Sequence, residues 1–440
     1  MTRENLKGAS ALKDAARAAY LPGIDFTGTY FYNQRIINLL GEDAKLPTMS
    51  FDPSTMSYQY NLVKDAEGRP VLNPETGGYI PSEIAVIPKE ALSYDVHNVF
   101  AGAFTLTQPI YMGGQIRALN KIAGFGEKIA EATTNNVAQE IIYSVDEAYW
   151  TVVSLKEKKL LAESFVALTD SLCYNVNAML EEGVATKSDL LSVQVRANEA
   201  NIALAKVSNG LTLSRMALAQ ICGLSPDIKM ELADEDEKVA AAQLTPAPVL
   251  TNMADVYSRR QDLEIVRQSI NLLKSREQLS LSEMLPKIAL IGAYSFSNPN
   301  TIDGFKKRFG GGFSVGATLQ VPIWHWGGDY KRYKAAKSNT TAQRLLLEDL
   351  EQKVQLQVSQ ARYSLDEAEK TYKMATLNMT KANENLFQAQ EGFREGVLTT
   401  SDVLAAQTAW LAASSEKIDA EISVRLAHTY LSKVTGVLPY

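Results

Sequence analysis

The chain has 440 residues, of which 46% are apolar and 21% charged, and its formal net charge is −6. This composition is typical of a folded protein and excludes a disordered or collagen-like chain. No dense basic cluster occurs, so nucleic acid is not an expected partner. The two cysteines and three histidines lie far apart, and no phosphate-binding or nucleophile motif occurs, so we expect no enzymatic activity, no cofactor and no metal site.

The N-terminal segment MTRENLKGASALKDAARAAYLP has a helical pattern from its first residues. No run of 18 apolar residues occurs anywhere in the chain, so the sequence predicts no transmembrane helix. We expect that a signal sequence has been removed or is absent from this sequence.

Two strands come next, at about residues 22–33 and 99–109. In both segments apolar and polar residues alternate with period 2, and aromatic residues lie near the ends of the apolar faces. This pattern is typical of short amphipathic strands, whether in a membrane barrel or in ordinary hairpins on a soluble core. Residues 34–98 between them are rich in proline, tyrosine and polar residues, and we expect them to form a long loop.

A long helical hairpin is expected at about residues 115–221, with its tip at 181–190. Proline is absent from residues 110–225. Because a proline inside a helix costs about 3 kcal/mol, this absence favours very long helices. Residues 226–250 are then expected to form a linker or equatorial region.

The second half predicts the same order, with strands at about residues 287–297 and 313–323 and a helical hairpin at 329–435 whose tip lies at 394–403. Its first helix has an unbroken heptad pattern over nearly six heptads, which indicates a coiled coil. The seam residues alternate between small and large side chains: Val354, Val358, Ala361, Leu365, Ala368, Tyr372, Ala375, Met379, Ala382, Leu386, Ala389 and Phe393.

An internal repeat relates the two halves. The segments EEGVATKSDLL and REGVLTTSDVL, which begin at Glu181 and Arg394, share seven of eleven residues and lie 213 residues apart. The repeat is too long for a solenoid unit, so we expect duplication of a half-molecule, with repeats at residues 1–225 and 251–440. The same spacing aligns the strand-to-helix joints of the two halves: Pro109 and Gly114, and Pro322 and Gly327.

Together these features resemble the TolC family, the outer-membrane efflux proteins of Gram-negative bacteria. The resemblance covers nearly the whole chain and rests on the order of several motifs. They are the duplicated half, ALKDAARAAYLP before the first strand, the joints QPIYMGGQIRA and VPIWHWGGDYKRYKAAK, RRQDLEIVRQSI before the third strand, and an aspartate six residues after each tip glycine. The first half lacks a counterpart of RRQDLEIVRQSI.

The resemblance implies a mainly α protein with a β-barrel part: a homotrimer whose four strands per protomer form a 12-stranded barrel in outer-membrane lipid. A long α-helical coiled-coil tunnel would continue the barrel into the periplasm, and residues 34–98 would be an extracellular loop. The implied function is passive export of small molecules or proteins. The implied partners are a periplasmic adaptor (membrane fusion) protein and an inner-membrane pump of the RND, ABC or MFS type.

The resemblance also implies that the hairpin tips form the periplasmic entrance, where three copies of two aspartates would ring the opening. The expected gate residues are Asp189, Asp402, Phe393 and Arg394. Phe393 and Leu398 replace a tyrosine and an arginine of the gate network of TolC, so its hydrogen-bonded lock does not carry over. The residues expected to contact the adaptor are Gly183, Val184, Thr186 and Ser188 at the first tip and Gly396, Val397, Thr399 and Ser401 at the second.

Other interpretations remain open at this stage. The tip residues could be structural, with Ser188, Asp189 or Ser401 as N-caps of the returning helices and Phe393 packed in the seam. The whole chain could be a coiled-coil scaffold protein with small β-caps. A dedicated metal-ion efflux duct is a further alternative, although the methionines are scattered and histidine is scarce. The sequence identifies neither the cargo nor the particular pump.

Overall fold

The computed structural model describes residues 1–234, 252–304 and 306–438. Residues 235–250 of the expected linker and residues 251, 305, 439 and 440 of the second expected repeat therefore lie outside the described residues. The chain divides into two compact units. The helical unit comprises Met1–Ala16, Arg117–Ser280 and Tyr330–Tyr440, and the sheet unit comprises Arg17–Ile116 and Leu281–Asp329.

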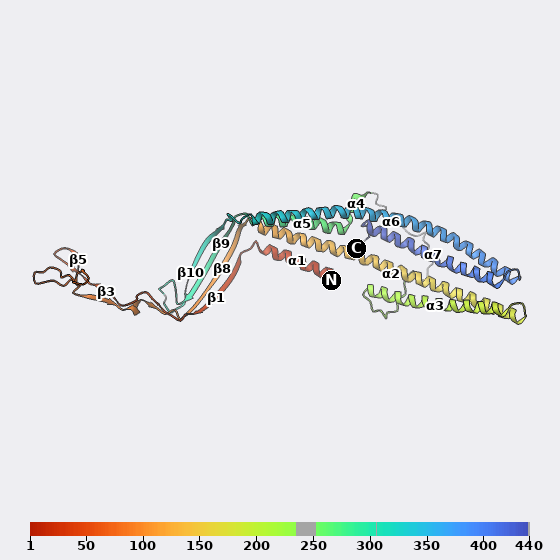
Figure 1. The fold of residues 1–440 in the computed structure, drawn as a ribbon, viewed down its shortest axis with the longest axis horizontal. Coiled ribbons are helices and arrows are strands. Elements are labelled where there is room, and N and C mark those ends of the chain that lie inside the picture. Colours follow the sequence, from red (N-terminus) through yellow and green to blue (C-terminus); the bar gives the residue numbers. More distant parts are fainter. Residues whose placement is uncertain (235–251, 305, 439–440) are drawn as a thin grey trace. The chain divides into compact units, whose positions relative to one another are not determined.

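Two long helical hairpins form most of the helical unit (Figure 1). The outgoing helices α2 (Gln115–Glu181) and α6 (Gly328–Arg394) have 67 residues each, and the returning helices α3 (Lys187–Ile221) and α7 (Thr400–Val434) have 35 each. Every bound of the second hairpin lies 213 residues after the matching bound of the first. At a rise of 1.5 Å per residue, α2 and α6 are each about 100 Å long. The shorter helices of the described residues are α1 (Thr2–Ala18), α4 (Met253–Arg259) and α5 (Gln261–Ser282).

The heptad pattern of α6 marks its packing face. Every seam residue from Val354 to Phe393 is buried or half-buried. Val354 packs with Leu431 of α7 and with Val256 and Leu263 of α4 and α5 in one apolar cluster. The small residues of the seam let helix backbones approach closely, so the sequence pattern sets which face of α6 meets its neighbours.

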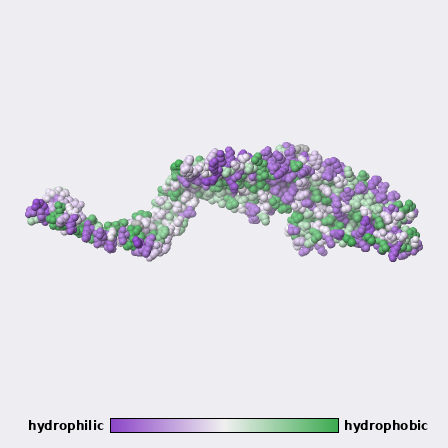
Figure 2. Space-filling model, in the orientation of Figure 1, coloured by the Kyte–Doolittle hydropathy of each residue, from purple (hydrophilic) through white to green (hydrophobic). Residues whose placement is uncertain are grey.

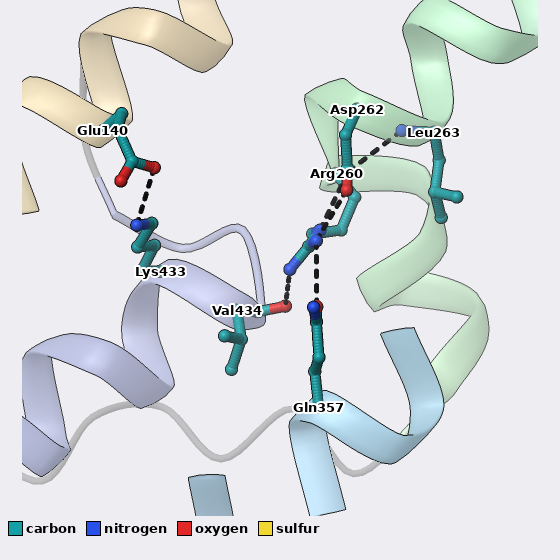
Figure 3. Close-up of polar contacts among 7 residues, drawn as sticks. All are labelled: Glu140, Arg260, Asp262, Leu263, Gln357, Lys433 and Val434. Atoms are coloured by element: carbon teal, nitrogen blue, oxygen red, sulfur yellow. Dashed lines mark hydrogen bonds and ion pairs between the residues drawn. The ribbon is translucent and has the colours of Figure 1, made fainter. Parts of the chain in front are cut away.

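The motif RRQDLEIVRQSI forms a polar junction at the start of α5 (Figure 3). The Arg260 guanidinium donates to Oδ2 of Asp262 at 2.6 Å and to Oε1 of Gln357 on α6 at 3.3 Å. It also donates at 3.0 Å to the carbonyl of Val434, the last residue of α7. Because the last carbonyls of a helix have no partner within it, Arg260 caps α7 and ties it to α5 and α6.

The Asp262 carboxyl depends on this arginine for its charge. Burial acts to raise its pKa, but the hydrogen bond and the charge of Arg260 outweigh burial, so the pKa of Asp262 lies below its usual value. The carboxylate is therefore ionised at neutral pH in a partly buried position.

Arg260→Ala is expected to lower the free energy of unfolding by about 2 kcal/mol, because Asp262 and the Val434 carbonyl lose their common partner. Denaturant unfolding of the purified chain, followed by circular dichroism, measures the loss. The matched control is Lys370→Ala, which removes an exposed ion pair with Asp366 on α6 and should cost much less, because exposed ion pairs contribute little to stability. Equal losses in the two variants would contradict the capping role of Arg260.

The sheet unit contains a four-stranded antiparallel sheet in the order β1–β8–β9–β10. Its strands are β1 (Gly23–Tyr32), β8 (Asn98–Met112), β9 (Lys287–Asn298) and β10 (Gly310–Gln320). The last strand ends at Gln320 rather than at residue 323, because Pro322 has no N–H for a ladder. β1 and β10 are the edges of this sheet, so the sheet of a single chain is open and closes no barrel.

The two faces of this sheet differ in chemistry. Directly paired residues share a face, and adjacent residues point to opposite faces. One row across the four strands consists of Phe26, Phe104, Tyr294 and Phe313, and the adjacent row, on the other face, consists of Asp25, Thr105, Ala293 and Ser314. The apolar face is exposed; Phe313, for example, has 75% of its surface accessible.

The expectation of a loop at 34–98 was wrong in detail. This segment contains short paired strands and one turn of 3₁₀ helix: β2 (Ile37–Asn38), β3 (Ala44–Pro47), β4 (Met49–Asp52), β5 (Ser57–Tyr60), β6 (Ile84–Ile87), η1 (Lys89–Leu92) and β7 (Ser93–Tyr94). The strands have two to four residues each, which is too short for a period-2 pattern to emerge. They are held by pairings such as Ala44 with Ile87, which are distant in sequence.

Within the part of the chain that the structure describes, no helix combines the length and the apolar character needed to cross a membrane.

Candidate functional site

The two hairpin tips have the same backbone geometry. Gly183 and Gly396 each adopt a left-handed conformation with φ of +74°, which glycine adopts without a steric penalty. The amide of Val184 donates to the carbonyl of Met179 at 2.7 Å, and the amide of Val397 donates to that of Gly392 at 2.8 Å. This six-to-one hydrogen bond is the Schellman helix ending, so each glycine ends its outgoing helix.

A capping box starts each returning helix. At the first tip, the Thr186 hydroxyl accepts from the Asp189 amide at 3.2 Å, and Oδ2 of Asp189 accepts from the Thr186 amide at 2.9 Å. At the second tip, Thr399 and Asp402 form the same pair at 3.3 Å and 2.8 Å. These hydrogen bonds satisfy amides that a helix start leaves unpaired.

The N-caps are therefore Thr186 and Thr399, not the serines or aspartates that the sequence suggested. The helices begin at Lys187 and Thr400, two residues earlier than serine caps would give, because threonine reaches the amide three residues ahead. The spacing T-x-x-D at both tips would have identified the caps.

The capping hydrogen bonds also fix the charge state of the two aspartates. The hydrogen bond from the threonine hydroxyl lowers the pKa of Asp189 and of Asp402 the most. The hydrogen bond from the threonine amide lowers it further. Both carboxylates are ionised at neutral pH. All of these bonds use Oδ2.

The other two expected gate residues lie differently. Phe393 packs against the apolar cluster of Leu172, Val176, Val193 and Val403, which brings together α2, α3, α6 and α7 near the tips. Arg394 is exposed and forms an ion pair with Glu391 on its own helix. In the described chain, therefore, Phe393 holds the two hairpins together, whereas the ion pair of Arg394 lies within α6.

The expected tip residues reach the surface to different degrees. Val184 and Val397 are 71% and 79% exposed at the apex of each turn. Ser188 and Ser401 are exposed on the first turn of each returning helix. The Thr186 and Thr399 side chains are occupied by the caps, but both residues remain exposed.

A groove of about 850 Å³ lies between the two hairpins at the tips. Its walls include the last turns of α2, the last turns of α6, and Val403 and Gln407 of α7. Gln407 is 1% exposed, and its Oε1 has no hydrogen-bond partner within the described residues. A buried acceptor without a partner costs about 1–3 kcal/mol, so Gln407 weakens the packing beside the groove. No local sequence pattern indicates this groove, because its walls come from three helices.

The strand-to-helix joints belong to the sheet unit. Pro109 lies at a register shift between β8 and β9, and Gly114 has a φ of +85° just before α2. Gly327 has a φ of +73° just before α6, and Pro322 lies between β10 and that helix. These residues lie where the chain passes from a strand into a helix.

A polar ladder joins α2 to α7 in antiparallel register. Arg425 lies 4.3 Å from the ring centre of Trp150, and the hydroxyl of Thr429 donates to Asp146 at 2.6 Å. At the C-terminal end of α7, Lys433 pairs with Glu140 at 2.7 Å (Figure 3). In the other direction the ladder continues through Lys158 and Asp419, which pair at 2.5 Å.

Two carboxyls, Glu157 of α2 and Glu421 of α7, lie within this ladder. Burial raises the pKa of both, while the charges of Lys417 and Arg425 lower it. The charge of Glu157 further raises the pKa of Glu421, and Lys417 lies 4.0 Å from Glu421. Glu157 lies on α2 and Glu421 on α7, so no local sequence pattern indicates this cluster.

Among the described residues, no group of three or more histidine, cysteine, aspartate or glutamate side chains is arranged to hold a metal ion.

Comparison with known proteins defines the class first. The fold is similar to that of the outer-membrane channel OprN, with a TM-score of 0.75 over 99% of this chain and 86% of that chain at 14% identity. It is also similar to the Campylobacter jejuni CmeC outer membrane channel, with a TM-score of 0.72 over 99% of this chain and 82% of that chain at 16% identity. The protein has the fold of outer-membrane channels.

The sequence then fixes the family. Residues 82–224 and 253–437 match the model of the family "Outer membrane efflux protein", which is more than half of the chain. The outer membrane efflux protein BepC of Brucella suis biovar 1 (strain 1330) is 24% identical over 333 residues, which are 75% of this chain and 71% of that protein. The chain belongs to the outer membrane efflux protein family, whose members are channels of the Gram-negative outer membrane.

The carboxyl cluster predicts a pH dependence. The pKa of Glu157 is raised, so the folded state favours its protonated form. The contribution of the protonated carboxyl to the stability of the fold is complete below the ordinary pKa of 4.5, and it is lost as the pH rises through the raised value. Glu157→Gln should therefore raise the melting temperature at pH 7 and leave it nearly unchanged at pH 4. Thermal melts of the detergent-solubilised chain at both pH values measure the effect.

The matched control for this measurement is Glu163→Gln, an exposed glutamate on the same helix. It should change the melting temperature little at either pH. A destabilised Glu157→Gln variant at pH 7 would contradict the account.

Proposed function

We propose that three copies of this chain form an outer-membrane exit duct for an efflux or secretion system. The observation that carries the proposal is the open antiparallel sheet with one exposed aromatic face and one small, polar face. In lipid, backbone groups at a sheet edge have no water to bind, so a spanning sheet must close. A four-stranded sheet is too small to close alone, whereas three copies supply twelve strands.

In this arrangement the apolar face meets lipid and the polar face lines the lumen. The row with Phe26 and Phe313 would face the membrane, and the row with Asp25 and Ser314 would face the channel. The edge strand β1 of one copy would pair with β10 of the next. Each copy thus completes the hydrogen bonding of its neighbours.

The helical hairpins would form a periplasmic tunnel about 100 Å long. The equal lengths and constant spacing of the two hairpins support an origin by duplication of a half-molecule. Six similar hairpins in a trimer can close a tube with quasi-equivalent contacts. The tunnel would supply no energy, so transport depends on an inner-membrane pump of the RND, ABC or MFS type.

The hairpin tips would form the periplasmic entrance. Asp189 and Asp402 remain ionised and cap their helices through Oδ2, so three copies would bring six fixed negative charges to one opening. Such a ring favours cations and repels itself, which resists full closure. Phe393 would hold the hairpins in place at the entrance by packing between them. Arg394 would contribute its positive charge next to Phe393.

The groove between the tips is the proposed docking site for a periplasmic adaptor protein. Exposed Val184 and Val397 offer an apolar contact to a helical partner. Gly183, Ser188, Gly396 and Ser401 would shape the contact surface around them. The cargo is not determined by any of these residues.

Single-channel recordings in planar bilayers test the gate. Asp402→Asn and Asp189→Asn remove the charge but keep an oxygen that can complete the cap, so the double variant should lose cation selectivity with little loss of stability. Thr399→Ala is the matched control, because it weakens the cap by about 1 kcal/mol and keeps the charge. Unchanged selectivity in the double variant would contradict the gate, and the absence of any conductance in the unaltered protein would contradict the duct.

A further inference from the structure

Residues 34–97 form a two-stranded ribbon that continues the pairing of β1 and β8 outward (Figure 1). The last pair of the sheet is Tyr32 with Asn98, and it is followed by Ile37 with Tyr94 and by the four pairs from Ala44 with Ile87 to Pro47 with Ile84. Between these pairs, the Asn33 amide donates to the His97 carbonyl at 2.7 Å and the Leu39 amide to the Leu92 carbonyl at 3.1 Å. We call this segment the outer ribbon.

The base of the outer ribbon is fixed to the sheet unit. Asp95 pairs at 2.5 Å with Lys307, which lies in the connection between β9 and β10. This hydrogen bond, followed by those of His97, holds the pKa of Asp95 well below its usual value. The side-chain amide of Asn33 also donates to the Val96 carbonyl at 2.7 Å. The ribbon therefore leaves the sheet in a defined direction.

Beyond its base, the outer ribbon has no core of its own. Val96 is its one buried residue, and each of its small sheets has two strands. An isolated two-stranded hairpin is marginal in water and needs a third strand or a packed face. A packing surface supplied from outside the chain would therefore stabilise this ribbon.

One face of the ribbon is suited to such a contact. Met49 pairs with Tyr60 and Phe51 with Tyr58, so these four side chains share a face of β4 and β5. Each of them is exposed, and the rings of Phe51 and Tyr58 lie 5.4 Å apart. No charged residue lies on this face, because Asp52 pairs with Ser57 on the opposite one. Figure 2 shows hydrophobic and hydrophilic residues alternating along the ribbon surface.

The position of the ribbon indicates which molecule covers this face. It grows from β1, an edge strand of the sheet, and in the proposed trimer that edge pairs with the next copy. In the trimer, one outer ribbon would therefore extend from each of the three β1–β10 junctions, around one end of the channel. An anionic lipid surface is a poorer partner, since residues 34–97 contain five basic and nine acidic residues.

We propose that the aromatic face of β4 and β5 packs on the outer ribbon of a neighbouring copy, so that three ribbons form a collar beyond the outer end of the sheet. This inference rests on the proposed trimer. It concerns a segment that lies mostly outside the family match, since that match begins at residue 82. The collar gives each ribbon the additional packing surface that it lacks alone, and it encircles the path by which cargo leaves.

Photo-crosslinking tests the collar in the full-length, detergent-purified chain and in intact cells. The photoreactive amino acid p-benzoylphenylalanine replaces Tyr58 on the aromatic face or, as the matched control, Gln59 on the opposite face of the same strand. Position 58 should give several-fold more chain-to-chain product on a denaturing gel than position 59. Peptide mapping should place the new bonds within residues 34–97 of the second chain.

The oligomeric state of the same samples separates the two proposals. A trimer without chain-to-chain product at position 58 overturns the collar and leaves the duct intact, as does crosslinking at position 58 to lipid or to an unrelated protein alone. A sample with no trimer overturns the duct. Phe51→Ser with Tyr58→Ser gives a second readout: proteolysis within residues 34–97 should accelerate several-fold while the trimer persists, and an unchanged rate would also count against the collar.

Discussion

The unpaired edges of the four-stranded sheet constrain everything else in this protein. β1 and β10 each present a row of backbone donors and acceptors with no strand partner among the described residues. In lipid these groups find no water to bind, so in the proposed trimer the neighbouring copies complete the sheet. The aromatic face and the polar face of the same strands would then be the outside and the inside of a channel.

The helical unit contains two similar hairpins, and each depends on helix packing and on a tight turn at its tip. Helices of 67 residues cannot rely on intrinsic propensity, and α6 packs through a seam of alternating small and large residues. At the tips, a glycine in a left-handed conformation and a threonine–aspartate capping box turn each hairpin within a few residues. The polar ladder between α2 and α7 adds ionisable groups to this apolar scheme, and burial raises the pKa of Glu157 and of Glu421 within it.

The sequence predicted the elements whose patterns are local. Strands β1, β8, β9 and β10 follow period-2 alternation, and α6 follows its heptads, because in both cases one face of a long element is apolar. The outer ribbon was missed because its strands are short and pair across up to 57 residues, as Ile37 does with Tyr94. The environment of Glu157 and Glu421 and the groove at Gln407 depend on how α2 approaches α7, which no local pattern encodes. The N-caps at Thr186 and Thr399 were predictable from T-x-x-D, but the neighbouring Ser-Asp pairs drew the assignment two residues too far.

The central claim is that one chain is an incomplete channel and that three chains complete it. Native mass spectrometry of the chain purified in detergent counts the copies in the assembled particle directly. The account predicts a particle of three chains that persists until the detergent is exchanged for denaturant. A particle of one or two chains, or a protein that remains dispersed without any detergent, would contradict it.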